Sequence, residues 1–193
     1  MWSQFLVAFR VTALLTVLTG VIYPAAVTGV AQVIFPRQAH GSLVTRNGTV
    51  IGSDLIGQNF RKAEYFHPRP SAAGLTGYDA TASTGSNDGP TSLKLIDRVK
   101  ASVEQYRKEN PDYHGPIPSD AVTASASGLD PHISPANAQI QASRVARARG
   151  VEEAAVRQLV AQATEGPWLA FNGEARVNVL RLNLALDREV PWK

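Results

Sequence analysis

The first 35 residues of the chain contain a single charged side chain, Arg10, and this constrains the fold more than any other feature of the sequence. From Val11 to Phe35 run 25 residues without Asp, Glu, Lys, Arg or His. A helix of this length spans about 37 Å, more than the roughly 30 Å hydrocarbon core of a bilayer. Only a helix that satisfies its own backbone hydrogen bonds can cross there as one segment. The sequence therefore predicts a membrane anchor at residues 1–36, followed by one α/β (α+β) soluble domain at residues 37–193.

Two other interpretations of this segment fit less well. A cleavable signal peptide has an apolar stretch of about 7–15 residues followed by small residues at a cleavage site. Here the apolar run is longer, and Pro36 and Arg37 bound it without a clear cleavage pattern. A buried helix of a soluble protein would be shorter and would carry a polar face. We therefore expect a single-pass membrane protein.

Small residues recur at four-residue intervals along the apolar segment: Thr12, Thr16, Gly20, Pro24 and Thr28. Small residues let membrane helices approach closely, and threonine can hydrogen-bond across the contact. At 3.6 residues per turn each four-residue step drifts by about 40°, so the residues form a spiralling band. Glycine and proline are also simply common in membrane helices. The band is either an interface with a partner helix or part of a plain anchor.

The charges leave the topology open and exclude one class of partner. Arg10 lies on one side of the span and Arg37 and Arg46 on the other, so the positive-inside rule gives no clear orientation. The soluble part has 18 of the 19 basic residues and all 16 acidic ones, a balance too even for a nucleic-acid-binding surface. With no cysteine, the chain has no disulfide framework and no thiol chemistry.

The soluble part begins with hairpin and loop signals. Residues 42–52 predict a β-hairpin, because Asn47-Gly48 suits a type I′ turn and β-branched residues flank it. Residues 71–92 are rich in Gly, Ser, Thr, Asn and Asp and predict a long loop, which in a compact domain usually serves a function.

Helical patterns follow. Apolar spacing predicts a helix over residues 92–109 and another over 152–164. Ser134 and Pro135 suit the start of a third helix, which Gly150 would end. The tail at residues 177–186 alternates like a strand, yet Asn178 could cap a helix, and we favour the helix.

No enzyme signature is present, so we expect no catalytic residue and no metal ligand. The chain has no Gly-Lys pair for a P-loop and no Gly-x-Ser-x-Gly elbow. Its four histidines lack metal-ligand spacing. We interpret Asp130 and His132 as loop structure rather than a catalytic pair. Arg69, between two prolines, more often fixes its own loop by binding carbonyls than it binds an anion.

Several specific motifs occur in one order along the chain. They are Gly41-Ser-Leu, Gly52-Ser-Asp-Leu-Ile-Gly-Gln-Asn-Phe60, Tyr65-Phe-His-Pro-Arg-Pro-Ser-Ala72, Tyr78-Asp79, Ser83-Thr-Gly-Ser-Asn87, Val122-Thr-Ala-Ser-Ala-Ser-Gly-Leu-Asp-Pro-His-Ile-Ser134, Arg144-Val-Ala-x-Ala-Arg149 and Val177-Asn-Val-Leu-x-Leu-Asn-Leu-Ala-Leu-Asp187. Together they resemble the C subunit of the Kdp potassium-transporting ATPase. One departure is the insertion-like Gly74-Leu-Thr-Gly77, which affects only the length of that loop.

The resemblance implies an accessory subunit of an ATP-driven K⁺ uptake complex in a bacterial cell membrane. Its partners there are a channel-like subunit that selects K⁺, a P-type ATPase subunit that uses ATP and Mg²⁺, a small single-helix subunit and membrane lipid. The soluble domain is placed outside the cytoplasm. On this interpretation one contact loop is organised by Arg69, Ser71, Tyr78, Asp79, Ser86 and Asn87, and a second by Asp130 and His132.

Two alternatives remain. The family is also described as a catalytic chaperone that binds ATP and raises the nucleotide affinity of the ATPase subunit. Gln141 could then offer a donor and an acceptor to an adenine edge, with Arg144 on the same helix. The second alternative is an anchored hydrolase. Only the Ser, His and Asp content of the loops, including Ser86 and His132, favours it.

Overall fold

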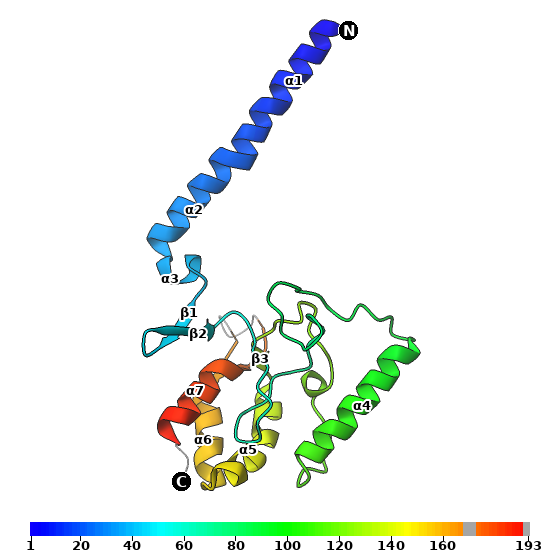
Figure 1. Ribbon diagram of the computed structural model, residues 1–193, viewed down its shortest axis with the longest axis vertical. Coiled ribbons are helices and arrows are strands. Elements are labelled where there is room, and N and C mark those ends of the chain that lie inside the picture. Colours follow the sequence, from blue (N-terminus) through cyan, green and yellow to red (C-terminus); the bar gives the residue numbers. More distant parts are fainter. Residues whose placement is uncertain (168–172, 191–193) are drawn as a thin grey trace. The chain divides into compact units, whose positions relative to one another are not determined.

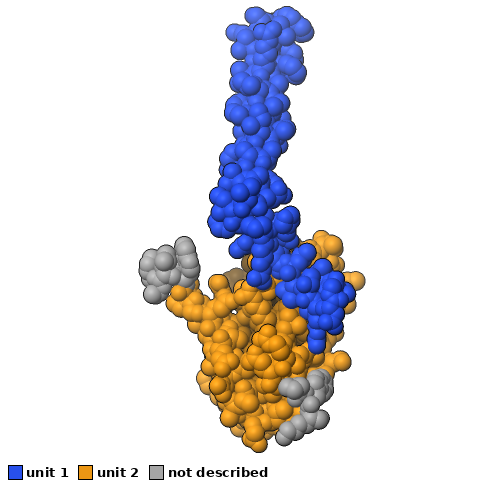
Figure 2. Space-filling view, turned by 90° about the vertical axis from the view of Figure 1, so that its left-hand side faces the viewer, with its two compact units in different colours: residues 1–51 blue, residues 52–193 orange. Residues whose placement is uncertain are grey.

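The computed structural model describes residues 1–167 and 173–190. It divides into two compact units, residues 1–51 and 52–193, which Figure 2 colours separately. The expected end of the anchor at residue 36 lies within the first unit. The last three residues of the expected soluble domain lie outside the described residues.

One continuous apolar helix, Trp2–Ile34, opens the chain and is long and apolar enough to cross a membrane. It consists of α1 (Trp2–Val17), a π-helical segment (Leu18–Ile22) and α2 (Tyr23–Ile34). None of its side chains is buried within the chain. The prediction of one N-terminal membrane-spanning helix followed by an α+β domain is confirmed.

The π segment was not expected, and Pro24 accounts for it. Proline lacks a backbone N–H, and its ring crowds the carbonyl four residues earlier, here that of Gly20. A wider turn relieves that conflict, and π turns mostly occur as such local bulges. Thr19 adds a hydrogen bond from its hydroxyl to the Leu15 carbonyl at 2.7 Å. Because a wider turn rotates less per residue, the segment opposes the forward drift that regular helical geometry predicts for the small-residue band.

A short helix and a hairpin follow. After α3 (Pro36–Ala39), strands β1 (Leu43–Arg46) and β2 (Thr49–Ser53) form a two-stranded sheet. Asn47 and Gly48 have φ of 51° and 79°, the positive values that a type I′ turn requires. The predicted hairpin is confirmed.

The main core of the second unit lies among three helices and a small antiparallel sheet. The helices are α5 (Pro135–Arg149), α6 (Glu153–Ala163) and α7 (Val179–Glu189), which lie close together in Figure 1. The sheet has the order β3-β5-β4, formed by His132–Ile133, Arg176–Asn178 and Thr164–Glu165. Its strands pair Ile133 with Val177 and Thr164 with Val177. Val145, Val160 and Leu182 are fully buried at the centre of this core.

The predicted caps of these helices are confirmed. Ser134 accepts a hydrogen bond from the Asn137 N–H at the start of α5, and Gly150 ends that helix at φ 67°. Asn178 caps α7 by accepting from the Arg181 N–H, so the tail is a helix, as favoured. β5 ends at this cap, and the alternating leucines from Leu180 to Leu186 all lie in α7.

The fourth helix, α4 (Leu93–Glu109), has a core of its own. Tyr106, Ala121 and Val122 are buried there, with Val99 and Val103 packed against them. Ala121 belongs to a single 3₁₀ turn, Ser119–Ala121. Figure 1 shows α4 set apart from the group of α5, α6 and α7. Between β2 and α4 the described chain contains neither helix nor strand, so the long loop begins earlier than the sequence indicated.

Candidate functional site

Two long loops, residues 57–86 and 122–132, are joined along their length, and we call them the double loop. Side-chain and backbone donors of one loop bind carbonyls of the other. The hydrogen bonds run from Ser71 Oγ to Gly128 O at 2.6 Å, from Ser83 Oγ to Ser127 O at 3.0 Å, and from Gly57 N to Leu129 O at 2.8 Å. The structure thus brings together the two contact loops that the sequence predicted separately.

Small residues allow the two backbones of the double loop to approach this closely. A Cβ added to Gly85 would lie 2.8 Å from the Ala126 carbonyl oxygen. A Cβ added to Gly128, which has φ +68°, would lie 2.6 Å from the Thr84 carbonyl oxygen. Real Cβ atoms essentially never approach so closely, so packing requires glycine at both positions, and Gly128 ends the run Thr-Ala-Ser-Ala-Ser-Gly. Sequence reasoning noted how specific this run is but gave no physical reason for it.

A charged cluster of Arg69, Asp130 and His132 ties the double loop together. Arg69 Nη1 lies 2.9 Å from Asp130 Oδ2, and Arg69 Nε donates to the Thr123 carbonyl at 3.4 Å. The backbone N–H and the ring Nδ1 of His132 lie 3.0 Å and 3.3 Å from Asp130 Oδ1. Burial would raise the pKa of Asp130, but the hydrogen bonds from His132 and Arg69 outweigh it and lower the pKa to about 2. In this geometry Arg69 fixes the loop, and Asp130 is a permanently charged acceptor.

Ser71 and Tyr78 form further hydrogen bonds that hold the double loop together. Ser71 Oγ accepts from the Tyr78 N–H at 2.8 Å while donating to Gly128. The Tyr78 hydroxyl donates to the Arg69 carbonyl at 2.7 Å, and burial raises the pKa of Tyr78. Tyr78 has φ 59°, an uncommon value for a residue with a side chain. These contacts hold a strained turn in one conformation.

The other predicted contact residues lie farther along the loop. Asp79 accepts from the Thr81 N–H and hydroxyl, and these hydrogen bonds lower its pKa. Ser86 accepts from Arg98 Nη2 at 3.0 Å, which links it to α4 rather than to the Arg69 cluster. The next residue, Asn87, has a positive backbone φ of 50°. The predicted set therefore extends from the Arg69 cluster to the end of the first loop, where Ser86 binds α4.

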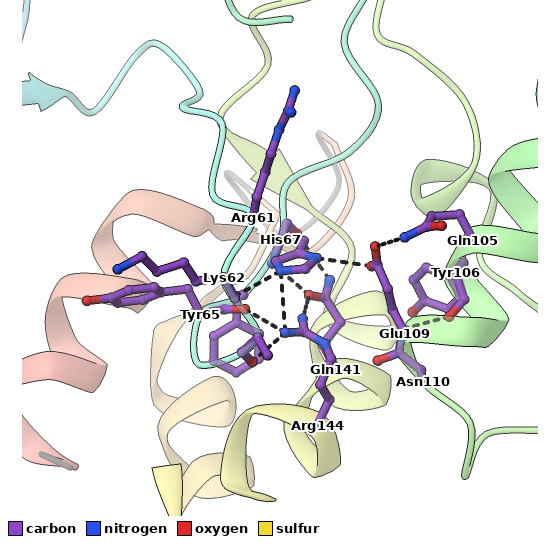
Figure 3. Close-up of polar contacts among 12 residues, drawn as sticks. Arg61, Lys62, Tyr65, His67, Gln105, Tyr106, Glu109, Asn110, Gln141 and Arg144 are labelled. Carbon is purple, nitrogen blue, oxygen red and sulfur yellow. Dashed lines mark hydrogen bonds and ion pairs between the residues drawn. The ribbon is translucent and has the colours of Figure 1, made fainter. Parts of the chain in front are cut away.

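Gln141 and Arg144 on α5 belong to a separate polar cluster (Figure 3). The Gln141 amide is 2% exposed. Its Oε1 accepts from His67 N at 2.7 Å and from Arg144 Nη2 at 2.7 Å. Its Nε2 donates to His67 O at 3.1 Å and to Asn137 Oδ1 at 3.0 Å. In this arrangement both donors and both acceptor positions of the amide are in use.

Two cavities flank this cluster. One, of about 490 Å³, lies between α4 and the loop 59–78 and is lined by Gln141 together with Arg61, Arg69 and Arg98. Another, of about 400 Å³, is lined by Arg144 with Asp112 and Arg157. Gln141 and Arg144 are therefore hydrogen-bonded to each other but line different cavities. Among the described residues no group of three or more His, Cys, Asp or Glu could hold a metal ion.

Comparisons with known proteins agree with one another. The family model of the c chain of the K⁺-transporting ATPase, KdpC, matches residues 5–188. The chain is 59% identical over 189 residues to the potassium-transporting ATPase KdpC subunit of Myxococcus xanthus, covering 97% of this chain and 89% of the relative. The subunit of Polaromonas naphthalenivorans is 59% identical over 177 residues, 92% and 90% of the two chains. That of Koribacter versatilis is 52% identical over 192 residues, 99% and 97%.

Proposed function

The chain belongs to the KdpC family of K⁺-transporting ATPase c chains, and from that membership we propose that it is an accessory subunit that assembles and stabilises its complex. Its partners would be the channel-like subunit, the P-type ATPase subunit and the small single-helix subunit. ATP and Mg²⁺ would be used by the ATPase subunit. This chain would contribute a membrane anchor and a docking surface rather than catalytic groups.

The observation that carries this proposal is the internal bonding of the double loop. Arg69, Ser71 and Asp130 direct their polar groups at each other and at nearby backbone. Groups used in this way hold a shape and have little capacity left for chemistry. A loop surface fixed in one conformation loses little conformational entropy when it binds a partner. The double loop is therefore suited to recognition.

Substitutions in the double loop test this proposal. Arg69→Ala should reduce co-purification of the partner subunits, because it leaves Asp130 without its guanidinium partner. Arg157→Ala is a matched control, since that arginine pairs with Glu153 on α6, away from the double loop. Asp79→Ala adds an exposed position in the first loop whose change should not affect folding. Normal co-purification of both Arg69→Ala and Asp79→Ala, with melting temperatures near the parent value, would contradict docking through this surface.

We further propose that the soluble domain lies outside the cytoplasm, on the strength of the family resemblance and the long apolar helix. The chain has no cysteine, so single cysteines can report the topology. Leu75→Cys places a thiol at a fully exposed position of the domain, and Ser3→Cys places one near the other end of the helix. A membrane-impermeant maleimide should label only Leu75→Cys in intact cells. Labelling of Ser3→Cys alone would reverse the topology.

ATP binding by this subunit is a second proposal, supported by the cavity that Gln141 shares with three arginines. Because the Gln141 amide is already saturated, Arg61 and Arg98 would have to supply most of the attraction for phosphate. Calorimetric titration of the full chain with ATP should detect binding that Arg61→Ala weakens. Arg157→Ala, in the other cavity, is the control. No binding at millimolar ATP would contradict this proposal without affecting the first.

A further inference from the structure

His67 occupies an unusual position between α4 and the loop that precedes it. Its ring Nδ1 lies 3.1 Å from Glu109 Oε2 at the end of α4, and its Nε2 lies 3.0 Å from the Lys62 carbonyl oxygen. The side chains of His67 and Glu109 are 17% and 30% exposed. Figure 3 shows the ring between Glu109 and Arg144. The ring therefore bridges two parts of the domain that are far apart in sequence.

The hydrogen bonds identify the protonation state of this ring. A backbone carbonyl can only accept, so the Nε2 that faces Lys62 must carry a proton. An ionised carboxylate can also only accept, so the Nδ1 that faces Glu109 must carry one too. Burial would raise the pKa of Glu109, but hydrogen bonds from His67 and Gln105 outweigh it and lower the pKa, so Glu109 is ionised. With both nitrogens as donors, His67 is an imidazolium.

Arg144 does not donate a hydrogen bond to His67 Nε2. Its Nη1 lies 3.4 Å from His67 Nε2 but has two hydrogens, and both are directed elsewhere. They are donated to the Ala63 carbonyl at 2.6 Å and to the Tyr65 carbonyl at 3.0 Å. The hydrogen bond between His67 Nε2 and the Lys62 carbonyl oxygen therefore uses a proton on Nε2 itself.

The helix that this bridge holds has few other attachments. α4 is fixed by its small core around Tyr106, by the hydrogen bond from the Tyr106 hydroxyl to Asn137 Oδ1 at 2.9 Å, and by His67. Its other ion pairs among the described residues, from Lys94 and Arg98 to Asp88, join it to the loop immediately before it. α4 also forms one wall of the 490 Å³ cavity, through Arg98, Gln105 and Glu109. Movement of α4 would therefore change access to that cavity.

We propose that His67 and Glu109 form a pH-sensitive latch, which holds α4 against the loop 59–73 while His67 carries both protons and loosens when it loses one. Histidine is the side chain whose charge ordinarily changes between pH 5 and 8. The charged groups that contact its ring are Glu109 on α4 and Arg144 on α5. On its own loop, Lys62 contacts the ring through its carbonyl oxygen, and its ammonium group lies 3.9 Å from Glu64.

Proton linkage determines whether the latch opens as the pH rises or as it falls. The closed form holds a proton on His67 through the hydrogen bonds to Glu109 and Lys62, whereas the opened form lacks the Glu109 contact. Closing therefore binds protons, and opening is favoured as the pH rises. At low pH the latch is closed and the cavity has its α4 wall in place. This property of the domain does not depend on which partner it binds.

Hydrogen exchange of the full chain, followed by mass spectrometry between pH 5.5 and 8.5, tests the latch. The protection of α4 is divided by that of α5 in the same sample, because this ratio removes the intrinsic effect of pH on exchange. The ratio should fall by about three- to tenfold as the pH rises. His67→Gln and Glu109→Gln should each give low protection with no pH dependence of this ratio. His132→Gln is the control, because His132 also faces a carboxylate, that of Asp130, which lies in the loop 122–132 and not on α4.

The nitrogen chemical shifts of His67 give an independent measurement that does not depend on how α4 moves. At pH 5.5 both ring nitrogens should carry protons, and the ring should lose one as α4 loosens. A constant α4-to-α5 ratio across the pH range would overturn the proposal. So would a His67 ring that is neutral at pH 5.5 while α4 is protected.

Discussion

The membrane helix buries no side chain within the chain, whereas the domain that follows it has a buried core. Residues 2–34 have no buried side chain within the chain, although most of them are apolar. The second unit encloses a core in which Phe66, Val160, Leu182 and Leu186 are fully buried. A change in the helix should therefore affect association with lipid or a partner, whereas a change in the core should affect folding of the chain itself.

The largest effect should come from the core of the domain. Leu182→Ala removes a fully buried side chain from α7 and should lower the free energy of unfolding by about 2–5 kcal/mol. The matched control is Leu95→Ala on α4, a partly exposed position that should cost less than about 1 kcal/mol. Chemical unfolding of the full chain in detergent measures both. Equal losses would mean that α4 is packed as firmly as the central helices.

Gly20→Leu in the membrane helix should leave the domain's stability unchanged and weaken assembly. Apart from the neighbouring residues and backbone of its own helix, no atom of the described residues lies within 4 Å of a Cβ added there. If the small-residue band faces a partner helix, the added volume should cost about 1–2 kcal/mol of association. Co-purification of the complex measures this, with Val17→Leu as the control outside the band. Equal recovery for Gly20→Leu, Val17→Leu and the parent would make the helix a plain anchor.

Acid should weaken the domain through Asp130. Because the folded state lowers the pKa of this carboxyl to about 2, its contribution is present above pH 4 and is lost as the pH falls toward 2. Allowing for partial exposure, the loss should be about 1–2 kcal/mol. As the pH is lowered from 5 to 2, the free energy of unfolding should fall less steeply for Asp130→Asn than for the parent. Parallel curves would show that the cluster with Arg69 does not stabilise the ionised form.

The elements that sequence reasoning predicted well are those set by local chemistry. Ser134, Gly150 and Asn178 act within one or two turns of the chain, so their roles as helix ends could be inferred from neighbouring residues. β3, β4 and β5 were missed because each has only two or three residues, too few for a periodic pattern. Their pairing depends on contacts between distant segments.

The candidate site was only partly predictable for the same reason. The resemblance and the residue types predicted two contact loops, but nothing local indicates that Ser71 binds the Gly128 carbonyl 57 positions away. His67 was missed as a site because its partners, Glu109 and Arg144, are 42 and 77 positions distant. The prediction of Gln141 as a nucleotide ligand used the chemistry of its amide correctly. It could not foresee that four hydrogen bonds to three neighbouring residues, His67, Asn137 and Arg144, already use that chemistry.

Hydrogen exchange of the chain alone and within the assembled complex tests whether the domain binds its partners through the double loop. If it does, residues 57–86 and 122–132 should be more protected in the complex, with α6 unchanged as an internal reference. Increased protection confined to α6 and the cavity beside Arg157, with the double loop exchanging equally in both samples, would contradict it.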